Sequence, residues 1–286
     1  MTASLVGKVA VITGASTGIG RACARVFARE GMRLVLASRR ADRLEAAVAD
    51  LVTSGAEVVG VPTDVAVYEN VQRLADQAIQ AFGQVDVAFL NAGIAGGSPL
   101  LDLDLDVWRA SIDTNIFGLL HGIKAFLPLL SRSEEPGSLL ATSSAAGIHG
   151  TAYNSAAYAM SKNAQLTVME ALYGQVRDAG SGVHVGVMLP PLTRTNLAGD
   201  DLEIWTSIEK QLAKSRSAPA LIEPEEFAEV VLEGIRERAF WILPTQEQND
   251  RLFGGRDPGA EVRRSKLVGA KADAMIERRT PDKYLW

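Results

Sequence analysis

Seven short apolar runs recur along the chain, and within each run the hydrophobic positions follow one another without alternation. The runs cover residues 9–13, 34–37, 58–61, 85–90, 138–142, 183–189 and 240–243. A strand that is buried on both faces gives this continuous pattern. Segments with a helical pattern lie between the runs, and several have a glycine near their end. The alternation predicts a doubly wound α/β fold with a parallel seven-stranded sheet, helices on both faces and ligands at the carboxyl ends of the strands.

The chain is expected to form a single domain, because no Pro-, Gly- or Ser-rich linker interrupts the strand and helix pattern. We place this domain at residues 1–250 and a carboxyl-terminal extension at 251–286. An amphipathic helical pattern within residues 196–220 leaves two hypotheses open. The segment is either a surface helix that packs on the core or a lid over the substrate.

Composition narrows the class of protein. Of the 286 residues, 47% are hydrophobic and 22% are charged, which is typical of a soluble globular domain. The net charge of −5 and the lack of a basic stripe argue against a nucleic-acid partner. No apolar run approaches the roughly 18 residues of a bilayer span, and the first residues lack the features of a secretory signal. We therefore expect a cytoplasmic protein with no membrane partner.

Metal binding is not expected. Cys23 is the only cysteine, so neither a disulfide within the chain nor a cysteine cluster can form, and we expect its side chain to be a buried packing group. The three histidines, His121, His149 and His184, lack the spacing of metal ligands. Of these, only His149 falls where it could line a substrate pocket.

The first apolar run leads into a glycine turn with the spacing Gly14-x-x-x-Gly18-x-Gly20, and a helical pattern follows. Glycines let the backbone approach a pyrophosphate, and the helix start directs unpaired N–H groups and the positive end of its dipole at the phosphates. The pattern predicts a dinucleotide site, although an ordinary strand-to-helix connection is the alternative. The expected contacts in this turn are Gly14, Ser16, Thr17, Gly18, Ile19 and Gly20.

Four further motifs follow in order. They are Asn91-Ala92-Gly93 after a strand, Asn115 within a helical pattern, Ser143-Ser144 after another strand, and Tyr158-x-x-x-Lys162. Together with the glycine turn, their order and spacing resemble the short-chain dehydrogenase/reductase family over about residues 5–245. The resemblance implies a Rossmann-type fold and a nicotinamide-dependent oxidoreductase.

The candidate catalytic residues are Asn115, Ser144, Tyr158 and Lys162. A free phenol titrates near pH 10, so a cation one helical turn from Tyr158 is expected to favour the phenolate. The resemblance implies that Tyr158 exchanges a proton with the substrate oxygen, while Lys162 lowers the pKa of Tyr158 and holds the nicotinamide ribose. It also implies that Ser144 is the catalytic serine of its pair, with Ser143 structural, and that Asn115 holds a water that links the lysine to solvent.

The residues at the end of the second strand predict which cofactor is preferred. Ser38 stands where an acidic residue would accept a hydrogen bond from a ribose hydroxyl, and Arg39 and Arg40 follow it. A guanidinium suits a 2′-phosphate, so NADP is favoured over NAD. Thr17 stands where many NADP-preferring relatives carry a basic residue. The two arginines are alternatively the solvated start of a helix.

Other cofactor contacts are implied by the resemblance. Asp64 and Val65 match the pair that contacts adenine, and Asn91, Ala92 and Gly93 match the turn beside the adenosine ribose. After the sixth strand, Pro190 precedes a second proline where the family has glycine, and proline fixes φ and removes a backbone donor from this loop. Thr193 and Thr195 both remain candidates for binding the carboxamide.

The sequence thus predicts an NADP-preferring oxidoreductase that interconverts an alcohol and a carbonyl compound, with an uncharged and fairly hydrophobic substrate. Two alternatives stay open: a dinucleotide-binding sensor or regulator without turnover, and a purely structural oligomer. The helical patterns at 107–130 and 156–176 are apolar around much of their circumference. We therefore expect a homodimer or a homotetramer.

Overall fold

A computed structural model describes residues 4–132, 135–149, 155–190, 192–195, 197 and 221–243 of the chain. Its centre is a seven-stranded sheet in the order β3-β2-β1-β4-β5-β6-β7, and every neighbouring pair is parallel. The strands are β1 (Val9–Thr13), β2 (Arg33–Ser38), β3 (Val58–Pro62), β4 (Val87–Leu90), β5 (Ser138–Thr142), β6 (His184–Met188) and β7 (Trp241–Ile242). The chain builds outward from β1 to β3 and then crosses back to β4. In folds of this kind, ligands bind at such a reversal, here at the carboxyl ends of β1 and β4.

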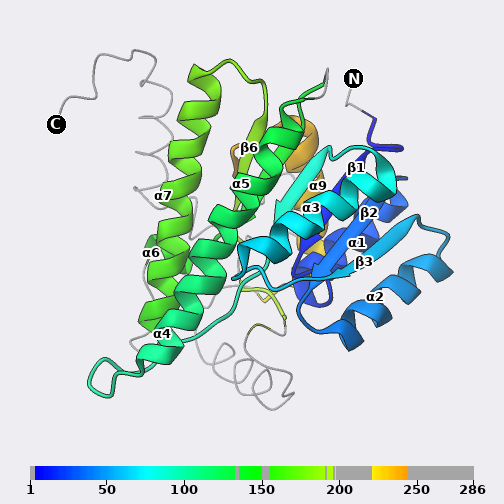
Figure 1. Ribbon diagram of the computed structural model, residues 1–286. Coiled ribbons are helices and arrows are strands. Elements are labelled where there is room, and N and C mark those ends of the chain that lie inside the picture. The colour runs from blue at the N-terminus through cyan, green and yellow to red at the C-terminus, as the bar shows by residue number, and fades with distance from the viewer. Residues whose placement is uncertain are drawn as a thin grey trace.

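Helices cover both faces of the sheet (Figure 1). One face packs against α3 (Tyr68–Phe82), α5 (Gly118–Leu130) and α7 (Ala156–Asp178), and the other against α1 (Gly18–Arg29), α2 (Ala41–Thr53) and α9 (Pro224–Glu237). The short helices α4 (Leu105–Ser111) and α6 (Ala146–His149) lie next to α7. The fold is therefore a doubly wound α/β domain, as the apolar runs predict.

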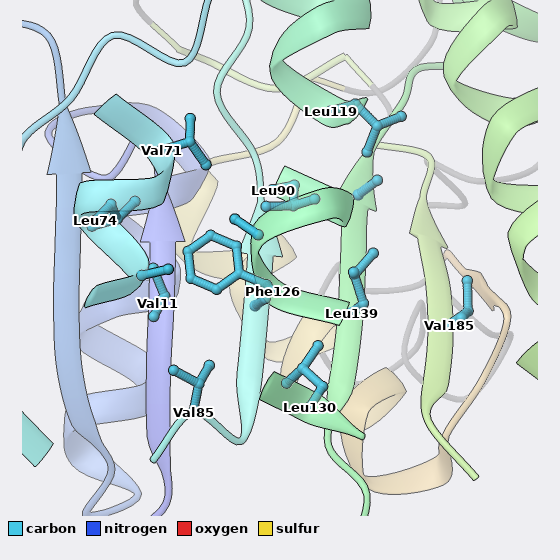
Figure 2. Close-up of a cluster of buried hydrophobic side chains, with 14 of the residues drawn as sticks. Val11, Val71, Leu74, Val85, Leu90, Leu119, Phe126, Leu130, Leu139 and Val185 are labelled. Carbon is cyan, nitrogen blue, oxygen red and sulfur yellow. The ribbon is translucent and has the colours of Figure 1, made fainter. Parts of the chain in front are cut away.

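Alternate side chains of each inner strand enter the two layers of the core. On β1, Val9 and Val11 join the cluster under α3, α5 and α7, whereas Ala10 and Ile12 join the cluster under α1 and α9. Figure 2 shows the first cluster, in which the Phe126 ring lies over the strands near Val11 and Leu139. All seven predicted strands are present, and their ends differ from the prediction by at most two residues.

The helical pattern at 107–130 is not one regular helix. A π-helical turn, η1 (Ile112–Phe117), separates α4 from α5, and the Gly118 N–H reaches back five residues to the Asp113 carbonyl. Single π-helical turns inside α-helices occur mostly at functional sites. This one contains Asn115, a residue that the sequence singles out as catalytic.

The structure weakens one reason for expecting an oligomer. Within the apolar pattern at 156–176, Leu166, Met169 and Leu172 of α7 are each buried in this chain against the sheet, so they need no second subunit to cover them. The large hydrophobic side chains that stay exposed on η1, α5 and α7 are Phe117, Leu120 and Met160. The predicted lid at 196–220, apart from Leu197, and the extension at 251–286 lie outside the described residues.

Candidate active site

The glycine turn has the geometry of a phosphate cradle. Gly14 and Gly18 adopt φ angles of +66° and +53°, which other residues rarely reach. At Gly20, a side chain would overlap the Gly14 carbonyl oxygen, so α1 can begin close to the end of β1 only with glycine there. Thr17 is the N-cap of α1, and its side chain makes no capping hydrogen bond. The first N–H groups of α1 thus remain for an anion.

The Asn91 side chain fixes the strand ends. Its amide nitrogen donates to the Thr13 carbonyl at 3.1 Å and to the Gly14 carbonyl at 3.4 Å, and its oxygen accepts from the Thr142 hydroxyl at 3.0 Å. The Thr13 hydroxyl oxygen in turn accepts the N–H groups of Asn91 and Ala92, each at 3.0 Å. Both N–H groups of the Asn91 amide are thus engaged within the protein, while the predicted contact of Asn91 with the cofactor stays a prediction. The residue ties β1, β4 and β5 together below the turn.

Gly93, the last residue of the Asn91-Ala92-Gly93 turn, lies close to two predicted catalytic groups. A Cβ atom on Gly93 would lie 3.2 Å from the Asn115 side-chain oxygen and 3.3 Å from the Lys162 ammonium nitrogen. A side chain at this position would therefore press on both groups. Gly93 thus forms the wall between the dinucleotide turn and the candidate catalytic residues.

The side chains of Tyr158 and Ser144 interact. Burial raises the pKa of Tyr158, and the smaller effect of the Ser144 side chain lowers it, so the net pKa is raised. Ser144 lies after β5 and Tyr158 in the first turn of α7, so the pair joins the sheet edge to that helix. Because its pKa is raised, the partly buried Tyr158 phenol is protonated near neutral pH and can donate its proton.

The hydrogen bonds of Lys162 go to groups other than Tyr158. Its nitrogen donates to the Thr142 carbonyl at 2.8 Å and to Gln165 Oε1 at 3.0 Å, and it lies 5.6 Å from the centre of the Tyr158 ring. Lys162 is only 3% exposed, and burial lowers its pKa to about 7. Burial raises the net pKa of Tyr158, and the effect of Lys162 on that pKa stays a prediction.

The Asn115 side chain holds the loop after β4 against α7. Its oxygen accepts the Ile94 N–H at 2.9 Å, and its nitrogen donates to the Ile94 carbonyl at 3.0 Å and to the Ser161 hydroxyl at 2.8 Å. Its backbone carbonyl accepts a 2.6 Å bond from Gln165 Nε2. The sequence reasoning missed Gln165. The signal was its position three residues after Lys162 and seven after Tyr158, which places a polar side chain on the same face of α7.

The structure separates the two arginines after β2. Arg40 is the N-cap of α2 and binds Asp42 through two nitrogens, at 2.7 and 3.2 Å. Arg39 is exposed, and among the described residues none forms a salt bridge with it. The hydroxyls of Ser38 and Ser16 lie 2.8 Å apart at the strand end. Arg40 thus fits the alternative of a solvated helix start, whereas Arg39 has its guanidinium available for a ligand.

The remaining predicted contacts of this group lie in the segments that follow β3 and β6. An Asp64 carboxylate oxygen accepts the Ala66 N–H at 3.0 Å, and the Val65 side chain packs on Gly118. Pro190 follows β6 and is partly buried.

The two threonines after β6 have different surroundings. Thr193 is 7% exposed and pairs with Ile222 in an isolated bridge. The Thr195 side chain lies against Gly18, where a Cβ atom would be 3.1 Å from it. Thr195 is thus the threonine that lies over the phosphate turn.

The groups not assigned to chemistry behave as packing groups. Cys23 is fully buried, as expected, and His184 bonds the Ser138 hydroxyl and the Ala239 carbonyl. Ser143 is structural as predicted, because its hydroxyl donates to the Lys162 carbonyl at 2.8 Å. The His149 side chain lies outside the described part of the structure. Within the described ranges, no cluster of three or more acidic, histidine or cysteine side chains could hold a metal ion, and no helix has the length and hydropathy of a membrane crossing.

Comparison with known proteins identifies the family. The model of the short chain dehydrogenase family matches residues 8–203, which is more than half of the chain. The chain belongs to the short-chain dehydrogenase/reductase family. An uncharacterized oxidoreductase of Listeria monocytogenes is 37% identical over 248 residues, which cover 84% of this chain and 97% of the relative. The protein is therefore an oxidoreductase of this family.

Solved structures of short-chain dehydrogenases share the fold. One, from Burkholderia phymatum in complex with NAD, has a TM-score of 0.75 and 32% identity, and the match covers 90% of this chain and 98% of that one. Another, from Burkholderia cenocepacia in complex with NADP, has a TM-score of 0.73 and 25% identity, and the match covers 83% and 94% of the two chains. Both nicotinamide dinucleotides are thus found in similar short-chain dehydrogenases.

Proposed function

We propose that this short-chain dehydrogenase/reductase interconverts an alcohol and a carbonyl compound with NADP as the preferred cofactor and Tyr158 as the general acid and base. The observation that carries the proposal is the side-chain interaction of Ser144 with the partly buried Tyr158, with the buried Lys162 beside the Tyr158 ring. These three groups lie next to a glycine turn whose helix N–H groups remain for an anion. Acid–base chemistry and dinucleotide binding are therefore available at the same edge of the sheet.

The described residues fit a nicotinamide dinucleotide. Gly14, Gly18 and the first N–H groups of α1 would hold the pyrophosphate, and Thr195 lies directly beside this turn. When bound, the nicotinamide would supply or accept the hydride. Because similar short-chain dehydrogenases occur with NAD and with NADP, the preference depends on the residues after β2 in this chain. The available guanidinium of Arg39 and the absence of a carboxylate at Ser38 favour NADP.

The residues of this chain have separate tasks in the proposed reaction. In reduction, Tyr158 donates its phenolic proton to the carbonyl oxygen, and its raised pKa keeps that proton in place beforehand. Ser144 donates a hydrogen bond to the carbonyl oxygen of the substrate as negative charge develops on that oxygen. Two of the three Lys162 donors bind Thr142 and Gln165, which leaves one N–H for a ligand.

The test is turnover by the purified protein with a panel of alcohols and carbonyl compounds, measured by the absorbance of the reduced nicotinamide with both cofactors. We expect Tyr158→Phe to lower kcat by about 100-fold or more and to leave the Kd for NADPH nearly unchanged, because only the titrating oxygen is removed. The matched control is Tyr173→Phe on the same helix, since Tyr173 packs its ring on Phe240.

Substantial turnover by a folded Tyr158→Phe variant would contradict the catalytic assignment. Tight NADPH binding without turnover of any compound in the panel would instead support the alternative of a non-catalytic sensor.

A further inference from the structure

A buried amide bridges two candidate catalytic groups. Gln165 is 2% exposed and lies on α7, one turn after Lys162. Its oxygen accepts the Lys162 ammonium N–H at 3.0 Å, and its nitrogen donates to the Asn115 backbone carbonyl at 2.6 Å. The glutamine thus links the lysine directly to the π-helical turn η1.

The two neighbours of this side chain make opposite demands. An ammonium offers only donors and needs an acceptor, whereas a backbone carbonyl needs a donor. A side-chain amide meets both demands at once, and the bond to Asn115 fixes which end of the amide faces the lysine. Leucine would satisfy neither neighbour, and asparagine is one methylene shorter. The hydrogen bonds to Lys162 and Asn115 therefore determine the orientation of the Gln165 amide.

We propose that Gln165 is a positioning residue for the reaction, which acts by holding the Lys162 ammonium at the end of β5 beside Gly93. This inference rests on the proposed function, since it assigns a task to a residue that supports Lys162. Without the glutamine, the lysine would keep only the Thr142 carbonyl as a bonded acceptor among the described residues. Its side chain would then lose both a fixed position and part of the stabilisation of its charge.

The surroundings of Lys162 make its charge sensitive to this one contact. Tyr158 is the titratable group of α7 that faces it, while β5, η1 and the loop after β4 present the Thr142 carbonyl, Asn115 and Gly93, which carry no charge. Burial is the cause of the lowered lysine pKa, and no charged group of the described residues contributes to it. The charge of Lys162 is therefore stabilised by the neutral acceptors Thr142 and Gln165 and not by a carboxylate.

Two substitutions should move the Lys162 pKa in opposite directions. Gln165→Leu removes an acceptor from the ammonium, so the charged form is less stable and the pKa falls by about one unit. Gln165→Glu places a carboxylate beside the ammonium, so the charged form is more stable and the pKa rises. A residue that only fills space would not produce this opposition. The matched control is Gln175→Leu, because Gln175 is exposed on the same helix.

The first measurement needs no cofactor. The protein is labelled with ¹³C-lysine, and the Cε resonance of Lys162, assigned by its loss in Lys162→Met, is followed against pH by NMR. The second measurement is the pH profile of kcat/KM for carbonyl reduction. We expect the loss of activity at high pH to begin about one pH unit lower in Gln165→Leu than in the wild type. In the pH range where both proteins are losing activity, kcat/KM of this variant should then be about tenfold lower. In Gln165→Glu, the loss of activity should begin at higher pH.

Each outcome decides one of the two proposals. A Lys162 titration that is unchanged in both variants, or that moves the same way in both, overturns the role of Gln165 even if the enzyme is active. Opposite shifts in the titration with an unchanged pH profile also overturn it, because the glutamine would then not act on the reaction. If the wild-type protein turns over nothing in the panel, the proposed function fails, while the cofactor-free titration still tests the contact. Circular dichroism of each variant establishes that it is folded.

Discussion

Cofactor preference can be tested by exchanging the charges at the end of β2. The double substitution Ser38→Asp and Arg39→Ala places a carboxylate where a ribose 2′-hydroxyl would be bound and removes the exposed guanidinium. The Ser38 hydroxyl already lies 2.8 Å from that of Ser16, so an aspartate at this position can accept the same hydrogen bond. We therefore expect a folded variant whose preference moves from NADP toward NAD.

The size of the change follows from the contacts. A hydrogen bond to a charged group contributes about 1.5–3 kcal/mol, and an exposed charge lies at or below the lower end of that range. Arg39 is exposed, whereas Ser38 is half-buried. The two neighbouring substitutions are not expected to add fully. The expected shift is about 1–3 kcal/mol, which is about a 5- to 150-fold change in the ratio of the two kcat/KM values.

The assay is steady-state kinetics with NADPH and NADH at one ionic strength, since phosphate contacts are screened by salt. Arg40→Ala is the matched control: it removes a neighbouring positive charge whose guanidinium already binds Asp42 through two nitrogens. This control should change the ratio by only a few-fold. If Arg40→Ala shifts the ratio as much as the double substitution does, Arg39 is not the phosphate ligand, and the reasoning from its available guanidinium is wrong.

Two further predictions concern stability and assembly. Burial lowers the pKa of His184 from 6.5 to about 4, so the folded protein binds fewer protons than the unfolded chain in this interval, and the free energy of unfolding should fall by up to about 3 kcal/mol as the pH drops from 6.5 to 4. Urea denaturation at several pH values should show a smaller loss in His184→Gln than in the wild type. For assembly, the exposed Phe117, Leu120 and Met160 lead us to expect light scattering to give two or four times the chain mass of 30.5 kDa, and a monomer of active protein would contradict this.

The sheet could be predicted because strands buried on both faces leave a local signal. Every residue of β1, β4, β5 and β6 is buried, which is why each gives an uninterrupted apolar run. The edge strand β3 is partly exposed, yet its valines still mark it. The glycine turn could also be predicted from the sequence, because the φ angles at Gly14 and Gly18 exclude most other residues. In both cases the requirement lies within a few consecutive positions.

The parts that could not be predicted depend on contacts between distant segments. The sequence cannot show that Arg40 binds Asp42 while Arg39 stays available, because that division depends on where α2 begins. Nor can it show that the Asn91 side chain is hydrogen-bonded to Thr13 and Thr142, which lie 78 and 51 residues away. The pKa of Lys162 depends on how completely the surrounding elements exclude water. Each of these properties becomes definite only after the strands and helices have packed.

The polar stripe on α7 is hard to explain by stability alone. Ser161, Lys162 and Gln165 are at most 3% exposed, and the space around them could in principle be filled by apolar side chains of similar volume. Burying an amine and an amide is unfavourable unless each donor and acceptor is paired, and apolar replacements of buried polar clusters are often neutral or stabilising. Binding a dinucleotide requires the glycine turn at α1, but it does not require Ser144 and Tyr158 beside a buried lysine. The presence of this buried polar stripe therefore favours an enzyme over a sensor that only binds the dinucleotide.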